Sequence, residues 1–270
     1  MISLKRNKKG EKVPASGLRV RRTSIYTPGQ EEVFKISRSK FNDFLLCQRC
    51  FYLDRVKGVV SPSMPGWSLN ETTDILLKKE FDACRKSKIP HRIFLEQGLD
   101  DVIPFMHDDL DKWRDSLHGG LGHHVKNTNI ILYGGVDDIW YKSSTGDLIV
   151  VDYKSQAKKD PIVSWKYLSD VYHESYKVQL DVYAYLLLKM GFKVASTGYF
   201  YVCNANRHAE SFDGELVFEE KLVSYECNPD WVEEKVLEMH SLLNSTALPP
   251  SEESCENCAY SKQRSNIENT

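Results

Sequence analysis

Residues 133–155 read YGGVDDIWYKSSTGDLIVVDYKS, and this stretch decides the fold of the chain. Two runs rich in Ile, Val, Leu and Tyr, residues 129–139 and 147–154, flank the polar segment KSSTG. Runs of β-branched and aromatic residues joined by a short polar turn are typical of a β-hairpin. We therefore predict a hairpin here and interpret the rest of the chain as its support.

Two carboxylates and a lysine of this hairpin carry the candidate chemistry. Side chains alternate along a strand, so Asp152 and Lys154 share one face while Tyr153 points into the fold. Strand pairing can bring Asp137 opposite Asp152, and two converging carboxylates are unfavourable unless a cation lies between them. Oxygen-rich sites suit Mg²⁺ or Mn²⁺, and a neighbouring lysine can hold the attacking water or a phosphate oxygen. The pattern indicates metal-assisted phosphodiester hydrolysis; the alternative is a surface ion pair between Asp152 and Lys154.

Composition places the chain among ordinary globular proteins. It has 270 residues, of which 41% are hydrophobic and 27% charged, enough for one large domain with appendages. The net charge of -2 argues against a uniformly basic nucleic-acid-binding protein. No apolar run approaches the roughly 20 residues that span a bilayer, so we expect a soluble cytoplasmic protein with no membrane partner.

Positive charge is concentrated in residues 1–35, which we interpret as a basic and flexible N-terminal arm. The arm can either contact phosphates or remain a solvated tail. Its cations are concentrated in residues 5–22, where Glu11 is the single acid; they are Lys5, Arg6, Lys8, Lys9, Lys12, Arg19, Arg21 and Arg22.

Helical and extended patterns alternate along the rest of the chain. We expect a helix over residues 37–53 capped by Ser37 or Ser39, and a second after Asn70 that buries Ile75, Leu76 and Phe81. Further elements are an amphipathic helix over residues 177–190, a strand over 194–203, one or two strands over 215–227, and a helix over 231–243 capped by Asp230.

Three motifs resemble one nuclease family. GGVDDIW, GDLIVVDYKS and YKVQLDVYAYLL contain G-x-x-D, D-x-K and Q-x-x-x-Y in that order. This arrangement resembles the RecB-like branch of the PD-(D/E)XK nuclease superfamily. The resemblance implies an α/β restriction-endonuclease-like fold, in which a central mixed sheet is flanked by helices.

The resemblance also implies roles for individual residues. Asp137 and Asp152 would be metal ligands, the backbone carbonyl of Tyr153 a further ligand, and Lys154 the catalytic lysine. Gln179 and Tyr183, four residues apart on one helix face, would support substrate and site. Asp138 would point to the opposite strand face and serve the structure.

Two positions depart from the family pattern. Val136 stands where the superfamily's name has proline, and the early helix over residues 74–84 lacks the histidine that many RecB-like nucleases carry. Asp74, Glu80 or Asp82 could supply an acid from that helix, and we favour Glu80 as the third metal ligand.

Two C-x-x-C pairs predict a second metal site. Cys47 with Cys50 and Cys255 with Cys258 provide four thiolates, enough for a tetrahedral ion. Several RecB-like nucleases, including AddB and certain CRISPR-associated exonucleases, join their first helix to their C-terminal segment with cysteines that hold a [4Fe-4S] cluster, usually one from the front and three from the back. The two-and-two division here fits Zn²⁺ equally well or better, so Zn²⁺ and the cluster both remain open. We predict a nuclease-like domain over residues 36–248 and a C-terminal segment, 249–270, whose cysteines pair with Cys47 and Cys50.

The function expected from this sequence is Mg²⁺-dependent hydrolysis of DNA, with single strands or duplex ends as substrate. The RecB-like resemblance favours an exonuclease in DNA repair, recombination or defence. The alternatives are a nuclease-derived module that binds DNA or protein without turnover, and an enzyme that acts on RNA.

Overall fold

The computed structural model describes residues 2–64 and 66–269, which form two compact units. Unit 1 contains residues 1–66, 124–131 and 233–270, and unit 2 contains residues 67–123 and 132–232. The chain therefore leaves unit 1 and returns to it. Each unit is described by itself.

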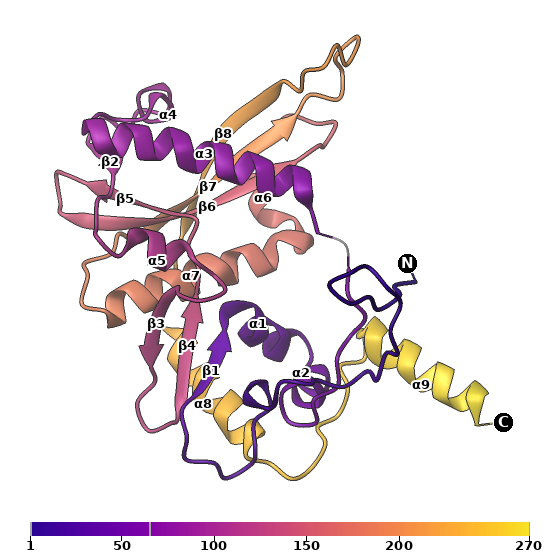
Figure 1. The fold of residues 1–270 in the computed structure, drawn as a ribbon. Helices are drawn as coiled ribbons and strands as arrows, with labels where there is room; N and C mark the ends of the chain where they lie inside the picture. The colour runs from indigo at the N-terminus through magenta and orange to yellow at the C-terminus, as the bar shows by residue number, and fades with distance from the viewer. Residues whose placement is uncertain (1, 65, 270) are drawn as a thin grey trace. The chain divides into compact units, whose positions relative to one another are not determined.

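A five-stranded mixed sheet is the centre of unit 2 (Figure 1). Its strand order is β2-β5-β6-β7-β8, and only the central pair, β6 with β7, is parallel. A parallel pair needs a crossover connection, which here contains α6 (Ser164–Ser169), η2 (Val171–His173) and α7 (Glu174–Lys189). The strands are β2 Val102–Pro104, β5 Asp138–Lys142, β6 Asp147–Gln156, β7 Thr197–Ala205 and β8 Phe218–Glu226.

Helices α3 (Ser68–Ser87) and α7 cover opposite faces of this sheet. The side chain of Tyr153 on β6 packs against Phe81 of α3, with ring centroids 5.8 Å apart. The next residue, Lys154, points to the other face and contacts Gln179 of α7. The predicted α/β fold, with a central mixed sheet flanked by helices, is therefore confirmed (Figure 1).

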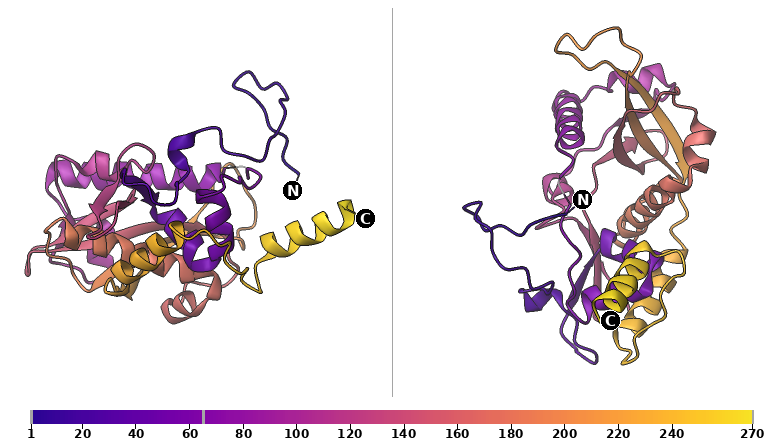
Figure 2. Two further views of the ribbon diagram at one scale, coloured as in Figure 1. Left: turned by 90° about the horizontal axis from the view of Figure 1, so that it is seen from below. Right: turned by 90° about the vertical axis from the view of Figure 1, so that its right-hand side faces the viewer.

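Aromatic side chains fill the space between α3 and the sheet. Phe81 is fully buried and stacks on Trp140 of β5 at 5.5 Å, while Phe94 meets the same indole edge-on at 4.6 Å. Phe94 belongs to α4 (Arg92–Glu96), and a further short helix, α5 (Leu110–Arg114), precedes β3 (Leu121–His124). Beyond the core, β7 and β8 form a long ribbon that ends in the loop at residues 206–217 (Figure 2).

The predicted hairpin is formed by β5 and β6, but the expected first strand, residues 129–139, is divided. β4 (Ile130–Gly134) belongs to a three-stranded sheet of order β1-β4-β3, and β5 begins only at Asp138. The chain changes course at Gly135, where a Cβ atom would lie 2.8 Å from atoms of Ser116. A residue with a side chain would clash there, so the close approach depends on glycine.

Unit 1 consists mainly of helices around β1 (Phe34–Ser37). The expected helix over residues 37–53 is two helices, α1 (Arg38–Leu46) and α2 (Gln48–Arg55), because Cys47 has extended backbone torsions. The side-chain oxygen of Ser37 accepts from the backbone N–H of Lys40, as predicted for a cap. The other elements are η1 Arg22–Ser24, α8 Trp231–Leu243 and α9 Glu256–Glu268, the last of which the sequence did not predict.

The first turn of α3 differs from its prediction. Asn70 lies inside the helix and donates a side-chain hydrogen bond to the backbone oxygen of Ser155, so it is not the cap. Ile75 and Leu76, expected to be buried, are about half exposed, while Leu77 and Phe81 are buried. In the described part of the chain, no helix is long and apolar enough to cross a membrane.

Candidate active site and cysteine cluster

Asp137 lies in the short segment between Gly135 and β5, next to the middle of β6. Its Oδ2 accepts a hydrogen bond of 2.9 Å from the backbone N–H of Tyr153, which orients the carboxylate. The register pairs Asp138 with Val151, so Asp137 stands across from Asp152 as the sequence predicted. The side chain of Asp137 is 23% exposed, so solvent and ligands can reach its carboxylate.

Asp152 is completely buried on β6. Burial raises the pKa of its carboxyl group to about 7; the charge of Lys154 opposes this shift, and the carboxylate of Asp137 adds to it. Within residues 2–64 and 66–269, neither carboxylate oxygen of Asp152 receives a hydrogen bond of normal geometry. A buried carboxylate with so few donors is a strong candidate for a cation ligand.

Lys154 is held on three sides. Its ammonium group forms an ion pair with the carboxylate of Asp152 and lies 3.4 Å from Oε1 of Gln179. It also lies 4.5 Å from the ring centroid of Tyr176, within cation–π range. The side chain is 17% exposed, so the charged group has one remaining open direction. The contacts fix the ammonium group beside the two carboxylates.

Gln179 and Tyr183 link α7 to the segment that carries Asp137. Nε2 of Gln179 donates to the hydroxyl oxygen of Tyr183 at 3.1 Å, and that hydroxyl donates to the backbone oxygen of Gly135. Both side chains are buried. The structure thus brings Asp137, Asp152, Lys154, Gln179 and Tyr183 into one connected network, and their catalytic roles remain predictions.

The acids of α3 have different surroundings from those expected. Glu80 is half exposed, at 51%, and its carboxylate lies 3.1 Å from Nε2 of His91. Asp74 instead faces the site: Lys78 lies 2.9 Å from its Oδ2 and 3.8 Å from Oδ1 of Asp137. Burial and the charge of Asp137 raise the pKa of Asp74, and Lys78 opposes the shift. The helix therefore brings Asp74, not Glu80, to Asp137.

Asp138 has a separate and structural environment. Its buried carboxylate accepts hydrogen bonds from Arg85 at 2.6 Å, from Arg114 at 2.8 Å and from the hydroxyl group of Tyr153 at 2.8 Å. Asp82, the other acid of α3, pairs with the same two arginines. This network ties α3 and α5 to the hairpin on the face opposite Asp152.

A hard divalent cation fits the donors of the acidic site. The under-bonded oxygens of Asp152, the exposed edge of Asp137 and the nearby carboxylate of Asp74 offer the oxygen ligands that Mg²⁺ and Mn²⁺ prefer. A cation there would also offset the burial and the repulsion from Asp137 that together raise the pKa of Asp152.

Four cysteine thiols gather in unit 1. The Sγ atoms of Cys47 and Cys258 are 3.8 Å apart, and Sγ of Cys50 is 3.5 Å from those of both Cys255 and Cys258. All four lie within 4.8 Å of one another, and none forms a disulfide. Cys47 and Cys50 lie at the start of α2, and Cys255 and Cys258 at the start of α9. The predicted clustering of front and rear cysteines is confirmed.

The surroundings of this cluster favour a thiolate at Cys47. Burial opposes ionisation, but backbone N–H groups of Cys50 and Glu252 lower the pKa of Cys47 to about 7. Burial raises the pKa of Cys258 to about 11. A bound cation would stabilise the thiolate form of all four cysteines.

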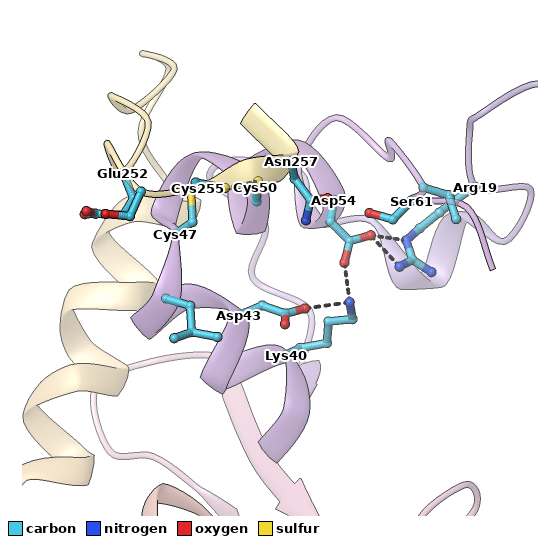
Figure 3. Close-up of a pocket in the computed structure, with 13 residues that line it drawn as sticks. Arg19, Lys40, Asp43, Cys47, Cys50, Asp54, Ser61, Glu252, Cys255 and Asn257 are labelled. Carbon is cyan, nitrogen blue, oxygen red and sulfur yellow. Dashed lines mark hydrogen bonds and ion pairs between the residues drawn. The ribbon is translucent and has the colours of Figure 1, made fainter. Parts of the chain in front are cut away.

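A cavity of about 550 Å³ lies beside the cysteines (Figure 3). Its wall includes Cys47, Cys50 and Cys255, and its opposite side is closed by an ion-pair cluster around Asp54. The carboxylate of Asp54 pairs with Lys40 at 2.9 Å and with Arg19. The cavity therefore has a thiol side and a charged side.

Comparison with known proteins identifies the family. Residues 68–263 match the PD-(D/E)XK nuclease superfamily, and the chain belongs to it. No curated protein matches the chain. Among solved structures, one from Eubacterium rectale described as "Putative exonuclease" is 13% identical, covers 88% of both chains and has a TM-score of 0.42.

Sequence reasoning missed two side chains of the site. Lys78, which lies between Asp74 and Asp137, could have been found from its spacing of four residues from Asp74 on a helix. Tyr176, three residues before Gln179, shares the helix face of the Q-x-x-x-Y motif. No comparable signal marks Arg114, which contacts Asp138 from the end of α5.

Proposed function

We propose that this protein is a metal-dependent deoxyribonuclease with Asp137, Asp152 and Lys154 as its catalytic residues. The observation that carries the proposal is the buried Asp152, paired with Lys154 and facing Asp137. Membership of a nuclease superfamily supports hydrolysis of a nucleic acid as the reaction. Structural acids are normally paired by several hydrogen bonds, as Asp138 is, whereas Asp152 has the ion pair with Lys154 and no hydrogen bond of normal geometry in the described part of the chain, which favours a ligand-binding site.

In this proposal Asp137, Asp152 and the backbone carbonyl of Tyr153 hold Mg²⁺ or Mn²⁺. The ion would supply an activated water molecule and neutralise charge that develops on the phosphate. Lys154 keeps its ammonium group beside the same position and donates a hydrogen bond to the attacking water or to a phosphate oxygen. Gln179 and Tyr176 orient that ammonium group, since both contact it directly. Tyr183 positions the backbone before Asp137 through Gly135.

DNA as substrate and an exonuclease mode rest on the RecB-like motifs. These motifs support a role in DNA repair, recombination or defence, with single strands or duplex ends as substrate. A module that binds without turnover would have no need for under-bonded carboxylates beside a lysine, which are unfavourable in an apo protein. RNA shares the phosphate chemistry and is the second substrate to test.

The proposal predicts that Lys154→Ala and Asp152→Asn each lower cleavage by at least about 100-fold, because each removes a charge next to the reacting phosphate. Labelled single-stranded DNA, duplex DNA and RNA are incubated with Mg²⁺, with Mn²⁺ or with chelator, and the products are resolved on gels. Lys142→Ala, on the neighbouring strand of the hairpin, is the control and should retain activity. Undiminished cleavage by both site variants would refute the assignment, and no cleavage of any substrate by wild type would favour the binding module.

A matched pair of acids on α3 tests the third ligand. We propose Asp74 for this role because it shares Lys78 with Asp137, whereas Glu80 is engaged with His91. Asp74→Asn should raise the Mg²⁺ concentration needed for half-maximal cleavage about tenfold or more, while Glu80→Gln should leave it unchanged. The reverse result would restore Glu80 as the ligand, as the sequence predicted.

For the cysteine cluster we propose a single Zn²⁺ ion. Four sulfurs around one tetrahedral ion at about 2.3 Å stand about 3.8 Å apart, which agrees with the measured separations of 3.5–3.8 Å. In a [4Fe-4S] cluster each cysteine binds a different iron, so the sulfurs must stand further apart. The site would join α2 to α9 and take no part in hydrolysis.

A further inference from the structure

The first segment of the chain folds into a small β-hairpin, residues 5–13, which we call the basic hairpin. Arg6 and Lys12 form an antiparallel bridge, and the backbone N–H of Val13 donates to the carbonyl oxygen of Lys5 at 3.1 Å. The sequence suggested either a phosphate-binding arm or a solvated tail. Backbone pairing gives this part of the arm a defined shape.

Asn7 organises the turn of the basic hairpin. Its Oδ1 accepts from the backbone N–H groups of Lys9 at 2.9 Å and Glu11 at 3.1 Å, an arrangement typical of an Asx-stabilised turn. Nδ2 of Asn7 donates to the carboxylate of Glu11, so the single acid of the hairpin is already occupied. The guanidinium group of Arg6 donates to the carbonyl oxygen of Gly10 at 2.6 Å.

Four lysines of the basic hairpin are left facing solvent. Lys5, Lys8, Lys9 and Lys12 are all exposed, and within residues 2–64 and 66–269 no carboxylate pairs with any of them. Some lysines elsewhere in the chain do have such partners, for example Lys78 with Asp74 and Lys177 with Glu174. The net charge of the whole chain is -2, so this concentration of positive charge is local.

The segment that follows the basic hairpin is attached to the cysteine-bearing part of unit 1. The backbone N–H of Arg19 donates to Gly58 at 2.8 Å, and that of Val60 donates to Gly17 at 2.8 Å. The guanidinium group of Arg19 pairs with Asp54 on α2, whose first turn carries Cys50 (Figure 3). The hairpin is thus tethered to a folded helix at a short distance along the chain.

We propose that the basic hairpin binds the sugar-phosphate backbone of the nucleic-acid substrate. Its four lysines have no carboxylate partner in the described part of the chain, its shape is held by backbone hydrogen bonds, and its attachment keeps it on the enzyme. Phosphates are the ligand that such lysines bind without regard to base sequence. The choice of a nucleic acid as the bound polyanion rests on the proposed nuclease function. The proposal itself concerns binding and does not depend on cleavage.

The test is the salt dependence of binding by the full chain in buffer without added Mg²⁺ or Mn²⁺, where the proposed cleavage lacks its metal and the cysteine site is left undisturbed. A quadruple variant, K5Q/K8Q/K9Q/K12Q, is compared with wild type by fluorescence anisotropy of a short labelled single strand and of a duplex. Each phosphate contact contributes about 0.7 to the slope of log K against log salt for single strands and about 0.9 for duplexes. We expect the slope to fall by about 3 and low-salt affinity to fall at least about tenfold.

A second quadruple variant changes the net charge equally outside the basic hairpin. It carries K79Q, K86Q, K126Q and K262Q, all at exposed lysines, and its slope should stay close to that of wild type. Equal losses in the two variants, or none in the hairpin variant, would overturn the proposal. Hairpin-dependent binding to phosphatidylserine vesicles with unchanged DNA and RNA binding would also overturn it. If wild type binds through the hairpin but cleaves nothing, the nuclease assignment fails and the hairpin proposal stands.

Discussion

Asp137 and Asp138 are adjacent acids whose environments assign them opposite tasks. Asp137 is partly exposed and has one backbone donor, from Tyr153, together with a distant lysine. Asp138 is fully buried and satisfied by two arginines and a tyrosine hydroxyl group. The carboxylate of Asp137 is available to a ligand. The carboxylate of Asp138 uses its hydrogen-bonding capacity to join α3 and α5 to the hairpin.

The matched substitutions Asp137→Asn and Asp138→Asn should therefore separate activity from stability. Asp137→Asn is expected to abolish cleavage with a change in unfolding free energy of less than about 1 kcal/mol. Asp138→Asn leaves Arg85 and Arg114 without their buried counter-charge and should cost about 3 kcal/mol, the lower end for a broken buried pair because Asp82 still contacts both arginines. Urea unfolding and cleavage assays measure the two effects. Equal stability losses in both variants would contradict the division of roles.

At the scale of elements, local pattern predicted the β5–β6 hairpin and α7 well because each is an uninterrupted run with a clear period. It failed where long-range packing interrupts a run. The segment rich in Ile, Leu, Tyr and Val extends across the two glycines, but β4 ends at Gly134, and Gly135 lies where a Cβ atom would approach Ser116 to 2.8 Å. Likewise, the apolar pattern of residues 37–53 continues through Cys47, where the backbone is extended between two helices.

The rotation of α3 decides which of its acids faces the hairpin. Residues on a helix are separated by about 100°, so Asp74, two turns before the buried Phe81, shares its face, while Glu80 lies about 100° away. Ile75 and Leu76, which the sequence assigned to the buried side, are about half exposed, so this rotation was not predicted. The acids of the hairpin needed no such knowledge, because strand alternation alone separates Asp152 from Tyr153.

At the scale of the whole chain, the two C-x-x-C pairs are the strongest long-range prediction that the sequence supports. The α2 and α9 pairs are separated by most of the chain, yet their sulfurs meet within 4.8 Å. Spacing alone could predict the chelating pairs but not the distances between sulfurs, which depend on how the two helix starts pack. Helix α9 has no buried residue, so its sequence lacks the apolar periodicity from which a helix is predicted. Its attachment to unit 1 therefore depends on the cysteines.

Removal of the proposed zinc ion should therefore destabilise unit 1 and release α9. Wild type prepared without oxygen is expected to be colourless and to contain one zinc per chain by elemental analysis. Cys50→Ser with Cys255→Ser should lose the zinc and about 3–5 kcal/mol of stability, roughly 10 °C in Tm for a chain of this size. Cys84→Ser, outside the cluster, should keep both metal and Tm, because its thiol contributes no ligand. A brown preparation containing iron and sulfide would contradict the single ion, since sulfurs 3.5–3.8 Å apart cannot each bind a separate iron of a cluster without moving apart.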